Sequence, residues 1–492
     1  MSAPRYPALF QLNTRVRLAE LAVALGRPAT LDDLGEAELD CLAEDGFDLL
    51  WLLGVWQTGA AARAVSASNP EWLAEYRRVL ADFRESDVCG SCFAIQDYQV
   101  HADFGGDAAL ARLRERLQAR GLRLILDFVP NHLAPDHRWV DAHPEFFVAG
   151  SEAQLAAEPH NYRRLATAGG ERILAYGRDP YFPGWSDTLQ LNYGQPALQE
   201  AMLGELRRIA GQCDGVRCDM AMLLLPEVFA RTWGIAAAPF WPRATAAIHA
   251  ERPGFLFLAE VYWDLEWTLQ QQGFDYTYDK RLYDRLVAGQ AGPVRDHLRA
   301  GLDFQDRLVR FLENHDEPRA AATFAADRHR AAAAITFLSP GLRFFHQGQR
   351  EGRRVRIPPH LSRGPAETPD AALAAFYDAL LDCLKEPVMR DGHWQLLDAD
   401  PAWAGNPSHD ALIVFAWSGP GERRRLVAVN YADHPSQAFV RLPWNDLAGR
   451  SWQLRDRLGP ARYERDGSDL AAHGLYLDLP AWGCHAFEVR AV

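Results

Sequence analysis

Charged side chains follow short apolar runs in this chain, at positions where a buried strand would end. "GVRCDMAM" (215–222) places Arg217 and Asp219 two residues apart in an apolar segment. Residues i and i+2 of a strand point to one face, so we expect this cation and this carboxylate side by side. A buried structural ion pair would explain these two residues as well as catalysis would.

Three other apolar runs end in residues of the same kind. "LILDFVPNH" brings Asp127 and His132, "LFLAEVYW" brings Glu260, and "VRFLENHDEPR" brings His315 and Asp316. Because several segments agree, a functional site at one end of a set of parallel strands is the better interpretation.

Three carboxylates with flanking histidines and an arginine suit the cleavage of a glycosidic bond. One carboxylate must be ionised to attack or stabilise the anomeric carbon, and another must be protonated near neutral pH. We expect Arg217 to depress the pKa of Asp219, and apolar neighbours to raise the pKa of Glu260. A metal-dependent barrel hydrolase would use similar residues, but no HxH or HExxH spacing occurs.

Apolar strand-like runs alternate with helix-like segments up to about residue 385. Eight such runs can be counted, at 7–13, 47–55, 122–132, 214–222, 254–260, 273–279, 307–314 and 341–348. Eight strand–helix units over this length predict an α/β fold, a (β/α)8 TIM barrel. The segment "NTRVRLAEL" (13–21) is expected to be a loop after the first strand.

Two segments depart from this alternation. Residues 133–193 are rich in Pro, Gly and aromatics, which predicts a subdomain inserted after strand 3. After residue 388, short strands at hairpin spacing predict a C-terminal antiparallel β-domain. The predicted organisation is a catalytic barrel at 1–132 and 194–387, an inserted subdomain at 133–193, and a C-terminal β-sandwich at 388–492.

Composition excludes several classes of function. The net charge is −13, and no basic run is longer than "RRR" (423–425), which argues against nucleic-acid binding. No apolar run approaches the roughly 18 residues of a membrane span, and the N-terminus does not resemble a secretion signal. Seven cysteines, an odd number, predict reduced thiols in the cytoplasm, with Cys89 and Cys92 of "CGSC" as loop thiols rather than a metal or redox pair.

The charged segments resemble the motif regions of the alpha-amylase family, glycoside hydrolase family 13. "DFVPNH", "GVRCDMAM", "FLAEV" and "FLENHD" resemble its four short regions in the family's order. "LQLN" (189–192) resembles the motif that closes the family's inserted domain, and "SCFAIQDYQVHADFGG" (91–106) resembles its aromatic-bearing segment.

The resemblance implies roles for individual residues. Asp219 would be the nucleophile, Glu260 the general acid/base and Asp316 the stabiliser of the transition state. The implied substrate contacts are Phe93, Asp127, His132, Arg217, His315 and Arg319. The family retains anomeric configuration through a covalent glycosyl-enzyme and needs no organic cofactor.

Two departures from the family pattern bear on substrate and metal. Many exo-acting members read Gly-Tyr-Asp where this chain has Cys92, Phe93 and Ala94, which weakens the case for a closed pocket around a terminal glucose. Arg319 resembles the other half of that pocket. The segment after the first strand has no Asp-rich calcium sequence, so no metal is expected.

These features predict hydrolysis of short α-glucosides or maltooligosaccharides, with a small carbohydrate as the only partner implied. Transglycosylation to a sugar or to phosphate is the alternative, because the same intermediate can serve other acceptors. A non-catalytic protein on this fold would be expected to lose at least one of the three carboxylates. Linkage, endo or exo action, acceptor and oligomeric state are left open.

Overall fold

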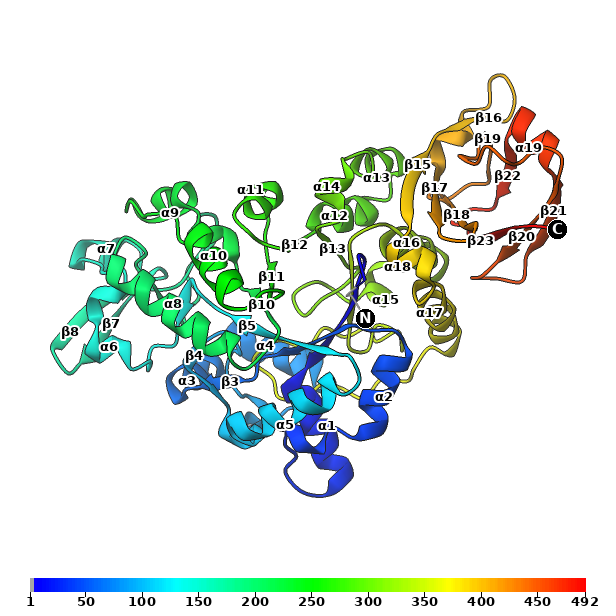
Figure 1. Cartoon of the computed structure of the whole chain (residues 1–492). Helices are drawn as coiled ribbons and strands as arrows, with labels where there is room; N and C mark the ends of the chain where they lie inside the picture. Colours follow the sequence, from blue (N-terminus) through cyan, green and yellow to red (C-terminus); the bar gives the residue numbers. More distant parts are fainter. Residues whose placement is uncertain (1–3) are drawn as a thin grey trace.

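Eight parallel strands close into a barrel in the computed structural model, which describes residues 4–492 (Figure 1). Around the ring their order is β1-β14-β13-β12-β11-β10-β5-β2. Their bounds are β1 Ala8–Asn13, β2 Leu49–Leu53, β5 Arg123–Phe128, β10 Gly215–Cys218, β11 Leu256–Ala259, β12 Tyr276–Tyr278, β13 Leu308–Arg310 and β14 Leu342–His346. Each of the eight predicted runs contains one of these strands, so the TIM barrel is confirmed.

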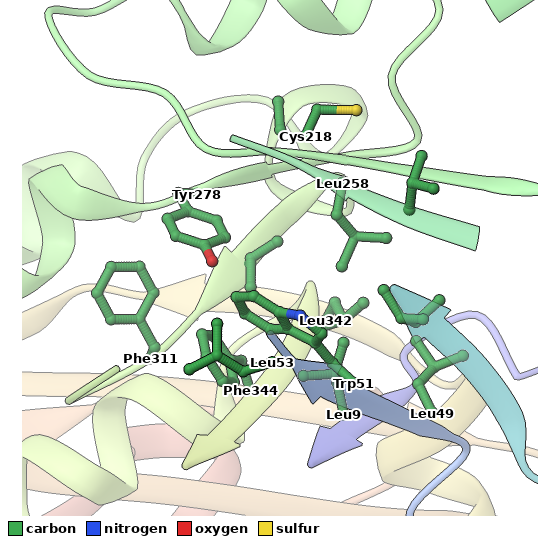
Figure 2. Close-up of a cluster of buried hydrophobic side chains, with 14 of the residues drawn as sticks. Leu9, Leu49, Trp51, Leu53, Cys218, Leu258, Tyr278, Phe311, Leu342 and Phe344 are labelled. Atoms are coloured by element: carbon green, nitrogen blue, oxygen red, sulfur yellow. The ribbon is translucent and has the colours of Figure 1, made fainter. Parts of the chain in front are cut away.

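The apolar runs are explained by burial on both faces of the sheet. All five residues of β2, Leu-Leu-Trp-Leu-Leu, are buried, because one face meets the barrel interior and the other meets the surrounding helices. Figure 2 shows side chains from β1, β2, β12 and β14 packed together, among them Leu9, Trp51, Tyr278 and Phe344. This cluster, called the hydrophobic floor below, packs beneath the polar residues of the site, since the Trp51 ring contacts the Arg217 guanidinium.

Helices cover the outside of the barrel. The principal ones are α1 Thr14–Leu25, α2 Glu36–Glu44, α5 Gly106–Gln118, α8 Pro196–Ala210, α10 Trp241–Glu251, α12 Lys280–Ala288, α16 Ala326–Leu338 and α17 Ala371–Leu384. The loop expected at 13–21 is wrong, since α1 begins at Thr14. Asn13 caps this helix by accepting a hydrogen bond from the Val16 amide, and the Leu, Ala, Arg and Glu residues that follow are strong helix formers.

The connection between β5 and α8 forms a small unit of its own. It contains a hairpin, β7 Tyr162–Thr167 with β8 Gly170–Ala175, and two short helices, α6 Trp139–Ala142 and α7 Glu152–Ala157. β6 His132–Leu133 pairs with β9 Leu189–Gln190, so the chain leaves and re-enters the barrel at one place. The limits predicted for an inserted subdomain stay a prediction, but this region has its own secondary structure.

A second excursion, not anticipated from the sequence, lies between β2 and β5. It contains β3 Trp56–Thr58, α3 Ala60–Ser68, α4 Pro70–Val79 and β4 Ile95–Val100. Its helices pack against the segment that follows β14, around a small separate core of Tyr76, Leu80, Val88 and Leu361. Two connections distant in sequence therefore meet above the barrel.

The C-terminal region is an antiparallel β-domain, as predicted. Its six-stranded sheet has the order β15-β17-β18-β23-β20-β21, and β16, β19 and β22 form a three-stranded sheet. Their bounds are β15 His393–Leu397, β16 Ala399–Pro401, β17 Leu412–Gly419, β18 Arg423–Asn430, β19 Ser436–Val440, β20 Ser451–Asp456, β21 Arg462–Asp466, β22 Leu475–Leu479 and β23 Cys484–Ala491. Within residues 4–492, none of the helices has the length and apolar character needed to cross a bilayer.

Candidate active site

Arg217 is the centre of a buried polar layer above the hydrophobic floor. Its guanidinium carbon lies 5.3 Å from the centre of the Trp51 ring and 5.2 Å from that of Phe93. The register of the sheet sets Arg217 on β10 beside Asp127 on β5 and Leu258 on β11. The sequence alone determines that Arg217 and Asp219 share a face, and the register determines which carboxylates join them.

One guanidinium binds both carboxylates predicted to react. Arg217 Nη1 is 2.7 Å from Oδ1 of Asp219, and Nη2 is 2.7 Å from Oε2 of Glu260. A third carboxylate, Asp127, lies 3.6 Å from Nη1 and accepts a hydrogen bond from the Gly54 amide. Arg217 and Asp127 are each 1% exposed, so their contacts form a fixed platform beneath the reacting residues.

Glu260 has the environment of a proton donor. Its Oε2 accepts a hydrogen bond from the Met220 amide at 2.8 Å, and its Oε1 accepts one from the Tyr262 hydroxyl at 2.8 Å. Met220 has a left-handed backbone, φ +44°, an uncommon conformation that aims its amide at this carboxylate. Burial raises the pKa of Glu260 to about 7, which agrees with the expectation from its apolar neighbours.

The pKa of Asp219 differs from the expectation. Arg217 does act to lower it, but burial acts more strongly and the nearby Asp127 and Asp316 carboxylates add to that effect. The net result is a raised pKa, so the predicted depression by Arg217 is wrong. A local pair cannot outweigh desolvation when two further carboxylates, Asp127 and Glu260, contact the same arginine.

Asp316 is held in a different environment from the other two carboxylates. Its side chain is 40% exposed, against 6% for Asp219 and 5% for Glu260. Burial acts to raise its pKa, but His315, whose Nε2 lies 2.9 Å from Oδ2, outweighs it and the pKa is lowered. The other ring nitrogen of His315 is 3.0 Å from the amide nitrogen of Gln11, which fixes the ring.

These carboxylates face a cavity of about 320 Å3 at the C-terminal ends of the strands. Of the residues predicted for the site, Phe93, His132, Asp219, Glu260 and Asp316 line it. Arg217 and His315 lie behind this lining and contact its carboxylates, and Asp127 contacts Arg217 in turn. The cavity is also lined by Trp72, Ser91, Trp185, Asp187, Thr188, Met220, Tyr262, Pro359 and His360.

His132 is positioned at the junction of the barrel and the inserted region. Burial lowers its pKa to about 4, so the ring is neutral near pH 7. Its Nδ1 lies 3.3 Å from the amide nitrogen of Asn131, and its ring is 5.1 Å from that of Trp185. A neutral imidazole here can exchange hydrogen bonds with sugar hydroxyl groups.

Arg319 does not line the cavity. Its guanidinium forms an ion pair with Glu313 and donates to the backbone carbonyl oxygens of Gln347 and Val355. It is 3% exposed. A direct contact between Arg319 and substrate stays a prediction, and its observed bonds to Glu313 and to two backbone carbonyl oxygens give it a structural role.

Several site residues were missed from the sequence. Gln11, in "ALFQLN", could have been noticed as a lone amide in an apolar strand, and Tyr262 follows Glu260 by two residues in "LFLAEVYW". Trp72, Asp187 and His360 lie outside any motif, and no sequence signal joins the three segments that bring them together.

The thiols and potential metal ligands lie apart from this chemistry. All seven cysteines are free, and Cys89 accepts a hydrogen bond from Arg15 at 3.1 Å. Across residues 4–492 no three His, Cys, Asp or Glu side chains are grouped as a metal site. The expectation that the reaction needs no metal stays a prediction.

Comparisons with a family model, with curated proteins and with solved structures all find alpha-amylases. Residues 38–273 match the family described as "Alpha amylase, catalytic domain", a range that includes Asp219 and Glu260 and stops before Asp316. The alpha-amylase MalA of Haloarcula japonica is 24% identical over 65% of this chain and 41% of its own length. The trehalose synthase/amylase TreS of Mycolicibacterium smegmatis is 28% identical over 39% of this chain and 34% of its own length.

The chain therefore spans less than half the length of either of these curated relatives. Among solved structures, the maltogenic alpha-amylase AmyB of Thermotoga neapolitana has a similar fold, with a TM-score of 0.69 and 17% identity over 99% of both chains. The sequence match and the similarity of the fold, a barrel followed by a C-terminal β-domain, point to the same family. Residues 38–273 of this chain are therefore similar to the catalytic domain of the alpha-amylase family, and the fold of the whole chain is similar to that of alpha-amylases.

Proposed function

We propose that this protein is a retaining α-glycosidase that acts on short α-glucosides or maltooligosaccharides. The observation that carries this proposal is the bridge from one guanidinium, Arg217, to both Asp219 and Glu260. A shared guanidinium supports retention, because retaining enzymes keep their two carboxyl groups only about 5–5.5 Å apart. Burial raises the pKa of Glu260 to about 7, and we assign it the role of acid and Asp219 that of nucleophile.

The proposed reaction uses each carboxylate in turn. Asp219 attacks the anomeric carbon, the bond from that carbon to the leaving oxygen breaks, and Glu260 gives its proton to that oxygen. Water then attacks the glycosyl-enzyme, Glu260 takes a proton from it, and Asp219 leaves. Asp316, ionised beside His315, stabilises positive charge on the ring.

Transglycosylation is the second candidate. Aromatic side chains of Trp72, Phe93, Trp185 and Tyr262 line the cavity, and apolar walls that exclude water favour transfer to another acceptor. One relative, TreS, carries both synthase and amylase in its name. In this reading the glycosyl-enzyme is intercepted by a sugar or by phosphate.

Product analysis separates these reactions. Purified wild-type protein and the Asp219→Asn variant are incubated with maltose, maltotriose, a longer maltooligosaccharide, trehalose, sucrose and α-glucose 1-phosphate. We expect free glucose or shortened chains from the wild type and no products from the variant. Longer or rearranged products with little glucose would establish transfer instead, and turnover that survives in the variant would refute the assignment of the nucleophile.

The seven free thiols support a cytoplasmic location, because the cytoplasm keeps thiols reduced. We propose this location together with the activity.

A further inference from the structure

The wall of the cavity opposite the proton donor is built by two long connections. Around the ring, β11 is the fourth strand from β1, so Glu260 faces the side where β1 lies between β14 and β2. Connections from those two neighbours contribute His360, from the segment after β14, and Trp72, from α4 after β2. The leaving oxygen must lie beside Glu260, so this wall faces the non-reducing side of the bound sugar.

Contacts between the two connections hold this wall in place. Arg363 forms two 2.8 Å hydrogen bonds with the carboxylate of Asp87, and Arg356 lies 2.6 Å from Glu75. A β-bridge joins Val88 to Leu361, next to His360. The small core of Tyr76, Leu80, Val88 and Leu361 lies between the connections, so the wall is packed rather than a free loop.

The His360 ring is fixed from several directions. It stacks on Trp72 with ring centres 4.2 Å apart and an interplanar angle of 20°. Its backbone oxygen accepts a hydrogen bond of 2.9 Å from the Cys89 amide. Its Nε2 lies 3.7 Å from Oδ2 of Asp187, a separation too long for a hydrogen bond.

Asp187 presents a carboxylate oxygen that lacks a partner. The residue is 3% exposed and lines the cavity, and its Oδ2 is buried with no hydrogen-bond donor among residues 4–492. A buried acceptor without a partner costs about 1–3 kcal/mol, and more when it is charged, so its retention requires an explanation. An acceptor at the wall of a sugar-sized cavity has an evident partner in a substrate hydroxyl group.

We propose that Asp187, together with His360 seated on Trp72, binds hydroxyl groups at the non-reducing end of the donor sugar and closes the cavity there. The proposal rests on the α-glycosidase function given above and names its substrate class. A cavity of about 320 Å3 lies at the low end of the range for small-molecule sites, about 300–1,000 Å3, which suits a short saccharide and release from a chain end.

This wall closes the cavity around the terminal sugar, the role that the family's Gly-Tyr-Asp segment has in many exo-acting members and that Cys92, Phe93 and Ala94 do not provide here. Ala94, at the position of that acid, is buried with Ala62 and Ala134 away from the cavity lining. Asp187 supplies an acid from the inserted region instead.

The Asp187→Asn variant tests the hydroxyl contact. We expect kcat/KM for 4-nitrophenyl α-glucoside to fall at least about tenfold, as for loss of a hydrogen bond to a charged group. The thermal midpoint should stay equal or rise, because the protein itself gives this carboxylate no hydrogen bond at Oδ2. Asp400→Asn, an exposed position in the C-terminal domain, is the matched control and should stay within about twofold.

Deoxygenated substrates identify the contact directly. The 4-deoxy and 6-deoxy analogues are compared with the parent glucoside in the wild type and in Asp187→Asn. At least one analogue should lose activity in the wild type and lose much less in the variant, because the shared bond is already absent. Equal losses in both proteins, or an Asp187→Asn variant that matches Asp400→Asn, would overturn the proposal.

Chain length tests the wall. In Trp72→Ala, the ratio of kcat/KM for maltopentaose to that for maltose should rise on the order of tenfold, whereas Trp403→Ala, an exposed control, should leave it unchanged. An unchanged ratio in Trp72→Ala would contradict closure of the cavity. The Asp219→Asn variant, measured in parallel, separates the two proposals. If Asp219→Asn stays active, the proposed glycosidase function is refuted. If Asp219→Asn is inactive and Asp187→Asn has wild-type activity, only the proposed role of Asp187 is refuted.

Discussion

Glu260, the proposed proton donor, owes its raised pKa to burial more than to any single partner. Glu260 is in contact with Arg217, which favours its charged form, yet burial raises its pKa to about 7. The Tyr262 hydroxyl and the Met220 amide both donate to its oxygens and moderate that rise. A carboxylic acid that is still protonated near neutral pH is what departure of an alkoxide requires.

The pH profile of kcat/KM tests this role. Glu260 acts in its protonated form, so activity should fall as pH rises through its pKa of about 7. Tyr262→Phe removes a hydrogen bond to the ionised form, so the pKa should rise and the basic limb should move to higher pH. A basic limb that stays flat to about pH 9, or one that moves down in the variant, would contradict the assignment.

For single residues, the sequence predicted which side chains line the site better than it predicted their pKa values. Asp219, Glu260 and Asp316 could be found because each follows an apolar run, which is a local signal. The raised pKa of Asp219 could not, since it depends first on burial and then on Asp127 and Asp316, which only the closed barrel brings near. Arg319 shows the same limit, because its partner Glu313 and the carbonyl of Gln347 occupy the guanidinium.

The connections after β2 and β14 decide the shape of the cavity. The barrel strands place the carboxylates, but Trp72 and His360 come from segments that pack on each other above the barrel. Strands could be predicted because burial on both faces makes them continuously apolar. The α3–α4 excursion could not be recognised as part of the site, since its packing partner is the distant segment around Leu361.

Arg363→Met tests whether this packing supports the site. The Arg363 guanidinium makes a bidentate contact with Asp87, so its loss should loosen the segment after β14. We expect KM for short substrates to rise several-fold, with about 1–2 kcal/mol lost in stability. Arg164→Met breaks a comparable but exposed pair with Glu152 and serves as the control. Equal KM values in both variants would show that the connection does not depend on this contact.

At the scale of the whole molecule, the C-terminal β-domain is docked on the barrel by a buried tryptophan. Trp417 of β17 is fully buried, and its indole donates a 2.8 Å hydrogen bond to the backbone oxygen of Leu338 in α16. Its ring meets Tyr6 edge to face, with centres 5.2 Å apart. The alternation of apolar residues predicted the β-domain. It did not predict this interface, because the sequence does not distinguish a Trp buried between domains from one buried within a domain.

Trp417→Ala should therefore lower the free energy of unfolding by about 3–5 kcal/mol, the usual cost of removing a large buried aromatic side chain. Urea denaturation followed by fluorescence and by activity measures this change, with Trp403→Ala, which is 55% exposed in the wild type, as the control. Barrel activity should be lost together with the fluorescence transition. A loss below about 1 kcal/mol would mean that the β-domain and barrel are not held together through Trp417.

In the proposed reaction, Asp219 forms a covalent bond with the anomeric carbon. Incubation with 5-fluoro-α-glucosyl fluoride, which slows hydrolysis of a glycosyl-enzyme, followed by peptide mass spectrometry, tests it most directly. We predict one added fluoroglucosyl group on the peptide that contains Asp219, and no addition in Asp219→Asn. A label on Glu260 or Asp316, or steady turnover of the reagent by Asp219→Asn, would contradict this account of the site.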